Sequence, residues 1–196
     1  MRIINRKISI LFFFLAFLIF QNKTHAIEIG SNEAKVKIKV FSSLTCPHCA
    51  TFHLKVFDKL KKNFIDKNKV QFLHIAFPLD LAALNGEKLL RCTNDDERIF
   101  KFLGDIYKKQ NSWATGSDIN KINESLIKIG VVNGLEVSKM KSCIESEKLQ
   151  EIVLQERIDA QKKYKITSTP TIFINEKKYE GAHDYQIIMK TIEKLL

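Results

Sequence analysis

The sequence predicts an α/β protein with a mixed central sheet, flanking helices and an inserted all-helical block. Three observations predict this arrangement. A strand-like run at 36–41 leads through a Cys-Pro-His-Cys motif at 46–49 into a helix-like run at 50–64. Residues 80–164 then read as helix throughout, and strand signals return at 171–174. The helical stretch is too long for a loop and too poor in strands for a second α/β domain, so we expect an inserted subdomain.

The N-terminus reads as a secretory signal. It begins with three basic residues, Arg2, Arg6 and Lys7. An apolar run at 8–20 follows, and then a polar stretch that ends at Ala26, where we expect cleavage. The alternative is an uncleaved membrane anchor, but this run of thirteen residues, broken only by Ser9, falls short of the roughly 20 that span a bilayer. The sequence therefore predicts a signal peptide at 1–26 and export to an oxidising, periplasmic compartment.

The basic charge of the chain does not indicate nucleic-acid binding. The net charge is +10, and residues 1–26 hold four basic residues and no acidic ones, so the mature chain would carry +6. Its lysines are spread along the sequence and form no basic cluster interleaved with aromatic residues. We therefore expect a solvated, lysine-rich surface and no nucleic acid among the partners.

The first strand and the first helix show two different periodicities. At 35–40 lysines alternate with apolar residues, which places Val36, Ile38 and Val40 on one face of a strand. The run at 50–64 has an apolar stripe at helical spacing, made of Phe52, Val56, Phe57, Leu60 and Phe64. His53 lies within this stripe, so we expect its side chain to point inward near the base of the motif.

The second strand leads into the helices of the inserted block. It spans 70–77 and ends at Pro78, and Asp80 is a suitable N-cap for a helix that continues to Cys92. Three further segments carry apolar residues at helical spacing, namely 95–109, 118–130 and 135–164. The inserted subdomain is therefore predicted to consist of helices only.

Strands return after the block. Residues 171–174 and 178–180 are predicted to form a hairpin, and 184–196 reads as a closing amphipathic helix. We therefore assign 27–79 and 165–196 to one domain, which the helical subdomain at 80–164 interrupts.

Two cysteines two residues apart at a helix start can close a disulfide within one turn. The sulfur of Cys46 would lie at the positive end of the helix dipole, where a thiolate is favoured. His48 can add a positive or hydrogen-bonding neighbour. A low thiol pKa favours thiol–disulfide exchange, because such a sulfur is a good leaving group. The motif therefore predicts redox chemistry.

Two alternatives for the motif are a zinc site and a purely structural disulfide. Tetrahedral zinc needs four ligands, but Cys92 and Cys143 are isolated in the sequence and only His53 is near the motif. A structural bridge across so short a loop would constrain the unfolded chain little. We therefore expect no bound metal.

The motif and two later segments resemble the DsbA-like form of the thioredoxin fold. The resemblance covers nearly all of the mature chain and is sharpest in LTCPHCA at 44–50, FPLD at 77–80 and TPTIFIN at 169–175. It implies that Cys46 is an exposed nucleophile and Cys49 its buried resolving partner. Pro47 and His48 would complete the catalytic motif.

The resemblance also implies a substrate-binding segment at Thr169 and Pro170. The peptide bond between them would be cis and would face the disulfide. Proline offers no N–H, so the preceding backbone would be free to pair with an extended substrate segment. The alternative is an ordinary trans proline at the first residue of a strand.

Two positions depart from the family pattern. Many relatives carry a buried acid in the strand before the motif as a proton relay, whereas Val40 lies in that region here. Some DsbA proteins carry Glu at the position of His53. In this sequence His53 either tunes the stability of the thiolate or is a packed core histidine. We interpret His74 and Trp113 as structural residues.

The remaining two cysteines lie in the helical block. Four cysteines allow three connectivities, and if Cys46 pairs with Cys49 then Cys92 is left with Cys143. The resemblance supports this pairing, because a branch of DsbA-like proteins has a second bridge in that subdomain. We predict a structural disulfide, worth roughly 4 kcal/mol for a loop of this length. A second redox pair and two free thiols are the alternatives.

The resulting functional prediction is an exported thiol:disulfide oxidoreductase that introduces disulfides into newly secreted, thiol-containing proteins. By family analogy, a quinone-linked membrane partner would reoxidise it, and it would need no cofactor. About 19 residues separate Ala26 from Cys46, which leaves no room for the N-terminal dimerisation domain of isomerases, so we expect a monomer. The alternatives are a disulfide isomerase or reductase of the same fold, and a non-catalytic metal- or partner-binding module.

Overall fold

The structure, a computed structural model, describes residues 26–196. The predicted signal peptide, apart from Ala26, lies outside the described residues. None of the helices in the described part combines the length and the apolar character that a membrane span requires.

A five-stranded mixed sheet forms the centre of the fold, in the order β1-β3-β2-β4-β5. The strands are β1 (Ile27–Ile29), β2 (Val36–Ser42), β3 (Val70–Ala76), β4 (Thr171–Ile174) and β5 (Lys177–Lys178). β2 pairs in parallel with β3 and antiparallel with β4, while β1 and β5 add antiparallel edges. The parallel pair places the end of β2, where the motif begins, beside the end of β3. No strand was predicted at β1, since three residues are too few to show alternation.

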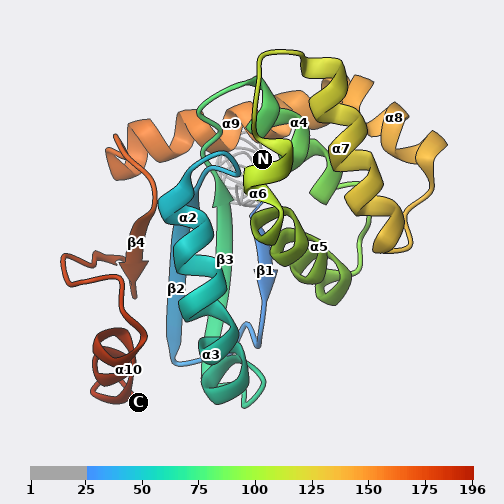
Figure 1. Ribbon diagram of the computed structural model, residues 1–196. Helices are drawn as coiled ribbons and strands as arrows, with labels where there is room; N and C mark the ends of the chain where they lie inside the picture. The colour runs from blue at the N-terminus through green and yellow to red at the C-terminus, as the bar shows by residue number, and fades with distance from the viewer. Residues whose placement is uncertain (1–25) are drawn as a thin grey trace, which may run out of the picture.

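One continuous helix follows the motif and covers β2 and β3 (Figure 1). It consists of α2 (Pro47–Phe52), the π-helical turn η2 (His53–Phe57), α3 (Asp58–Leu60) and a second π-helical turn, η3 (Lys61–Ile65). In the last turn the Asp66 N–H donates to the Lys61 carbonyl at 2.9 Å, five residues back, as a π-helix requires. All members of the predicted apolar stripe are buried, which confirms that this helix faces the core.

Six helices lie between β3 and β4, where a helical stretch was predicted. They are α4 (Leu81–Leu90), α5 (Asp96–Lys108), α6 (Gln110–Trp113), α7 (Ile119–Val132), α8 (Val137–Glu145) and α9 (Glu147–Tyr164). Side-chain oxygens cap several of them, as when Asp80 accepts from the Ala83 N–H at 2.7 Å. Figure 1 shows α9 running back along the molecule from α8 toward β4. That these helices form a subdomain of their own stays a prediction.

The sequence alternation in β2 separates two apolar cores. Val36, Ile38 and Val40 belong to a large core that extends under α2 and continues into α5 and α7. Phe41 faces the other way, into a smaller core with Ala160 of α9. The chain ends with α10 (Tyr185–Glu193), which packs near α3. Because the large core crosses from the sheet into the inserted helices, it holds the two parts together.

A disulfide joins Cys92, just after α4, to Cys143 of α8. It closes a segment of 51 residues in the helical block. In the chain-entropy model a loop of this size adds roughly 4 kcal/mol to the free energy of unfolding. The bridge lies outside the Cys-Pro-His-Cys motif.

A buried ionic network also joins the helical block to the sheet. Glu87 of α4 bonds to His74 of β3 at 2.7 Å and accepts from Arg91 at 2.8 Å. Arg91 reaches Glu156 of α9 at 2.7 Å, and the second oxygen of Glu156 accepts the backbone N–H of Ala76 at 2.8 Å. Burial opposes ionisation of Glu87, but His74 and Arg91 outweigh it and hold the pKa of Glu87 below its ordinary range. His74 is thus a structural residue that links β3 to α4.

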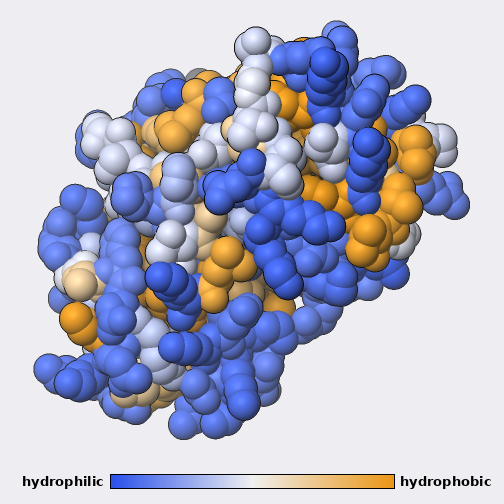
Figure 2. All heavy atoms as spheres, viewed as in Figure 1, coloured by the Kyte–Doolittle hydropathy of each residue, from blue (hydrophilic) through white to orange (hydrophobic). Residues whose placement is uncertain are grey.

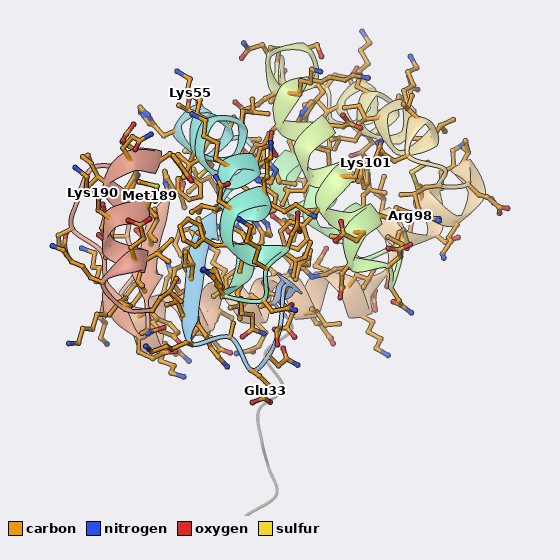
Figure 3. All side chains as sticks on the ribbon, turned by 90° about the horizontal axis from the view of Figure 1, so that it is seen from below. Glu33, Lys55, Arg98, Lys101, Met189 and Lys190 are labelled. Atoms are coloured by element: carbon orange, nitrogen blue, oxygen red, sulfur yellow. A yellow bond between two sulfur atoms is a disulfide. The ribbon has the colours of Figure 1, made fainter. Side chains whose placement is uncertain are left out.

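Hydrophilic side chains cover most of the face in Figure 2, and hydrophobic ones gather over the helical block. Val131 and Val132 at the end of α7 and Val137 at the start of α8 are exposed. The lysine-rich surface expected from the sequence is visible in Figure 3, where Lys55, Lys101 and Lys190 project outward.

Replacing Arg91 with leucine should destabilise the protein by about 3–5 kcal/mol, because two buried carboxylates lose their charged partner. Urea unfolding measures the change. The matched control is Arg98→Leu, which removes an exposed arginine of α5 that lies 3.8 Å from Asp95 (Figure 3). This control should change stability by less than about 1 kcal/mol. Equal losses in the two variants would contradict the assigned role of the network.

Candidate active site

The motif begins α2 with an N-cap that has no side-chain acceptor. Cys46 has extended backbone angles, and Pro47 occupies the first turn, where its fixed φ suits a helix start. The Cys46 carbonyl accepts from the Cys49 N–H at 3.1 Å and the Ala50 N–H at 3.2 Å. Since no side chain caps this end, the free N–H groups of the first turn are available to the sulfur of Cys46.

The two motif cysteines are both free thiols, and both are buried. Cys46 is 7% exposed and Cys49 is 1% exposed, while Pro47 and His48 lie at the surface. The expectation that Cys46 is exposed was therefore wrong in degree, although Cys46 is the more accessible of the two. The reason is the segment before β4, where the Thr169 carbonyl accepts from Cys46 Sγ at 3.3 Å and covers it.

The surroundings of Cys46 favour its thiolate and lower its pKa to about 5. The largest contribution is a hydrogen bond from the Cys49 thiol, which burial opposes and the Thr169 side chain supports. The backbone N–H groups of Cys49 and His48 add to the effect. The contribution of His48 to this shift comes from its backbone N–H, and the contribution expected from its side chain stays a prediction.

Cys49 shows the opposite behaviour. Burial, and then the neighbouring Cys46, raise the pKa of Cys49 far above its ordinary range. At neutral pH the pair therefore holds one proton on the inner sulfur, that of Cys49, and leaves the outer sulfur, that of Cys46, as a thiolate. This asymmetry makes Cys46 the better leaving group of the two.

The segment that covers the cysteines contains a cis peptide bond between Thr169 and Pro170, as the resemblance implied. The Thr171 hydroxyl donates to the Ser168 carbonyl at 2.7 Å and closes the turn there. The Thr169 hydroxyl is buried and has no hydrogen-bond partner in this thiol form. A buried, unpaired hydroxyl beside Cys46 can donate to a thiolate when one forms.

His53 lies beneath the motif as a packed aromatic ring. It stacks on Phe57 with ring centroids 4.5 Å apart and lies 5.1 Å from the ring of Tyr107. Burial, with a smaller effect of His74, lowers the pKa of His53 to about 3. His53 is therefore neutral at physiological pH and places no positive charge beside Cys46. Val40 is buried on β2, so that strand supplies no acid at this point.

Two polar residues of the helical block reach the motif and were missed in the sequence. Gln110 donates through Nε2 to the Leu44 carbonyl at 2.7 Å and to the Cys46 carbonyl at 3.1 Å. The Tyr107 hydroxyl lies 3.5 Å from the Ser43 carbonyl. A signal was present, since Gln110 lies midway between two aromatic residues at helical spacing, Tyr107 and Trp113.

The structure thus brings together the predicted catalytic residues (Cys46, Pro47, His48 and Cys49) and the predicted substrate-binding residues (Thr169 and Pro170). Cys92 and Cys143 lie apart from them in the helical block. Among residues 26–196 no group of three or more His, Cys, Asp or Glu side chains is arranged to hold a metal ion.

Comparisons with known proteins place this geometry in context. A family model described as thioredoxin matches residues 21–194. The structure is similar to the crystal structure of Wolbachia pipientis alpha-DsbA1, with a TM-score of 0.81 and 27% identity, over 87% of this chain and 90% of that one. The predicted thioredoxin fold with a helical insertion is thus confirmed.

Two curated relatives differ in length from this chain. Disulfide bond formation protein D of Bacillus subtilis is 29% identical over 177 residues, which cover 86% of this chain and 76% of that protein. A Rickettsia prowazekii protein, named as a protein-disulfide oxidoreductase, is 30% identical over 168 residues. The match covers 86% of this chain but only 60% of the Rickettsia protein.

We expect one thiol of the reduced protein to titrate at about pH 5, seen as thiolate absorbance near 240 nm. Cys46→Ser should abolish this transition. Cys49→Ala should move it to higher pH, because the largest hydrogen bond to Cys46 is lost, whereas Cys49→Ser keeps a hydroxyl donor and should move it less. A transition that survives in Cys46→Ser would contradict the assignment.

The stability of the reduced form should depend on pH through Cys46. Its folded pKa of about 5 lies below the ordinary 9.0, so ionisation stabilises the folded dithiol above pH 5 and the effect grows toward pH 9. The urea midpoint of the reduced form should therefore rise relative to that of the oxidised form as the pH is raised from 5 to 8. The Cys49 thiol, which also exists only in the reduced form, keeps its proton over this range because its pKa is raised. The remaining ionisable groups are common to both forms and cancel in the difference. A constant difference would contradict the assignment.

Proposed function

Because this chain belongs to the DsbA-like branch of the thioredoxin superfamily, we propose that it is a protein thiol:disulfide oxidoreductase. The observation that carries the proposal is the opposed behaviour of two adjacent sulfurs, with the pKa of Cys46 lowered to about 5 and that of Cys49 raised. A structural disulfide needs no such asymmetry, whereas an oxidant of other thiols depends on it.

The oxidised protein, with a Cys46–Cys49 disulfide, would react in two exchange steps. A substrate thiolate attacks Cys46 Sγ, a mixed disulfide forms, and Cys49 leaves and takes up a proton. A second substrate thiolate then attacks the substrate sulfur of the mixed disulfide, and Cys46 leaves as a thiolate. The substrate loses two electrons and gains a disulfide, and the protein gains two electrons as its dithiol.

The remaining site residues would support these steps. Pro47 starts the helix whose N–H groups face the sulfur, and the His48 N–H is one of those groups. The Thr169 carbonyl already contacts Cys46 Sγ, so an extended substrate segment would pair with the backbone before Pro170. Cys92 and Cys143 would serve as a structural disulfide.

The surface around the motif fits a thiol on an unfolded chain. Leu79 and Leu81, which flank the Asp80 cap, are about half exposed. Beside them a pocket of about 390 Å³ opens next to Thr45. Exposed leucines next to a reactive sulfur suit apolar segments that a newly secreted protein has not yet buried.

The cellular setting follows from the N-terminal pattern and the family. A basic start and a short apolar run fit export to the periplasm, where newly secreted proteins acquire disulfides. The reduced protein would return its electrons to a quinone-linked membrane partner and would act as a monomer. The main alternative is an isomerase or reductase, but the low pKa of Cys46 favours the oxidase.

Equilibration of the chain from Ile27 with glutathione buffers tests this proposal, with alkylation and mass measurement counting the reduced thiols. We expect a reduction potential near about −120 mV, and a value near about −200 mV or lower would mark an isomerase or reductase instead. Only Cys46 and Cys49 should become alkylated, because Cys92 and Cys143 stay bonded. Labelling of all four cysteines in the absence of reductant would contradict the structural bridge.

Oxidative refolding of a reduced substrate protein gives the second test. Cys46→Ser should abolish catalysis, and Cys49→Ser should abolish it too, because Cys46 alone cannot form the intramolecular disulfide that a substrate thiolate attacks. The matched control, Cys92→Ser with Cys143→Ser, also removes one cysteine pair but should keep catalysis. Normal activity in Cys46→Ser would overturn the proposed function.

A further inference from the structure

The segment that carries the reactive sulfur is held from the helical block by one amide. Gln110, the first residue of α6, is 5% exposed. Its Nε2 donates to the Leu44 carbonyl at 2.7 Å and to the Cys46 carbonyl at 3.1 Å. An amide nitrogen has two donor hydrogens, so these two bonds use the full capacity of the group.

These bonds matter because the peptide unit between Cys46 and Pro47 has no N–H. Its carbonyl is the only polar group through which the surroundings can fix the plane of that unit. The carbonyl accepts from the first turn of α2 and from Gln110. The same peptide unit sets the direction of the His48 and Cys49 N–H groups, which favour the thiolate of Cys46.

Gln110 is itself rigidly placed. The indole of Trp113, in the same short helix, is 1% exposed and donates to the Ile106 carbonyl at 2.8 Å. The Tyr107 hydroxyl lies 3.5 Å from the Ser43 carbonyl, one residue from the Leu44 contact. The end of α5 and the start of α6 therefore lie against residues 43–46, the turn that joins β2 to α2.

We propose that Gln110 is a positioning residue that links the helical block to the redox motif and favours its dithiol form over its disulfide. The inference rests on the proposed redox function of Cys46. The two forms respond differently because the reduced form carries a negative sulfur and the disulfide carries none. A donor that lowers the negative charge of the Cys46 carbonyl, and fixes the N–H groups toward the sulfur, therefore stabilises the reduced form more.

The test is Gln110→Met, which keeps the length of the side chain and removes both donors. Because both donors favour the reduced form, their loss should move the equilibrium with glutathione about tenfold toward the disulfide. A tenfold change corresponds to a reduction potential about 30 mV more negative. The thiolate transition of Cys46 near 240 nm should move to higher pH in the same variant.

The matched control is Asn133→Leu. Asn133 is also a buried amide of the helical block, and it donates to Asp105 at 2.9 Å and to the Ile129 carbonyl at 3.0 Å. None of the hydrogen bonds of Asn133 reaches the motif. The Asn133→Leu variant should therefore lose stability but keep the reduction potential of the unsubstituted protein. A second variant, Gln110→Asn, keeps the amide on a shorter side chain. It should shift the potential in the same direction as Gln110→Met, and it serves as the test if the methionine variant does not fold.

An unchanged potential and thiolate transition in a folded Gln110 variant would overturn the inference and leave Gln110 a purely structural residue. An equal shift in Asn133→Leu would do the same, because the effect would then follow general destabilisation. The proposed function fails by a different result, which is the absence of glutathione exchange at Cys46 and Cys49 in the unsubstituted protein.

Discussion

One hydrogen bond between two sulfurs is the interaction on which the site depends. The Cys49 thiol donates to Cys46, and this bond is the largest contribution that lowers the pKa of the outer sulfur. It requires that Cys49 keep its proton, and burial ensures this. The fold provides the burial by placing Cys49 under the first turn of α2 and against the large core. The same turn supplies the N–H groups that face Cys46.

The helical block contributes to the site as well as to the fold. The large core continues from the sheet into α5 and α7, and the network around Arg91 joins β3 to α4 and α9. Gln110 adds a direct contact with the motif. A buried ionic network is costly to desolvate, so its value here lies in fixing how the helices sit on the sheet. The geometry around Cys46 therefore depends on residues far from it in the sequence.

Strong periodicity explains what the sequence predicted. Alternation in β2, the apolar stripe after the motif and the long helical stretch all produced elements where they were expected. The π turns at His53 and Lys61 could not be predicted, because they shift backbone hydrogen bonds without changing the apolar spacing. Glu87 and Arg91 look like surface charges in the sequence, and only tertiary contact pairs them. Gln110 escaped notice because its partners are backbone carbonyls, so its place between Tyr107 and Trp113 was its one signal in the sequence.

The small exposed area of Cys46 has a consequence for the timing of any reaction at that sulfur. Cys46 is 7% exposed as a residue and its sulfur lies beneath the segment at Thr169, an arrangement that favours a thiol on a narrow and flexible piece of chain. Thiols on the rigid surface of a finished protein cannot come close enough for an in-line attack. Which polypeptides react at Cys46 would then depend on whether they have folded, and only weakly on their sequence. Proteins that have completed folding would then keep their free cysteines in the presence of this protein.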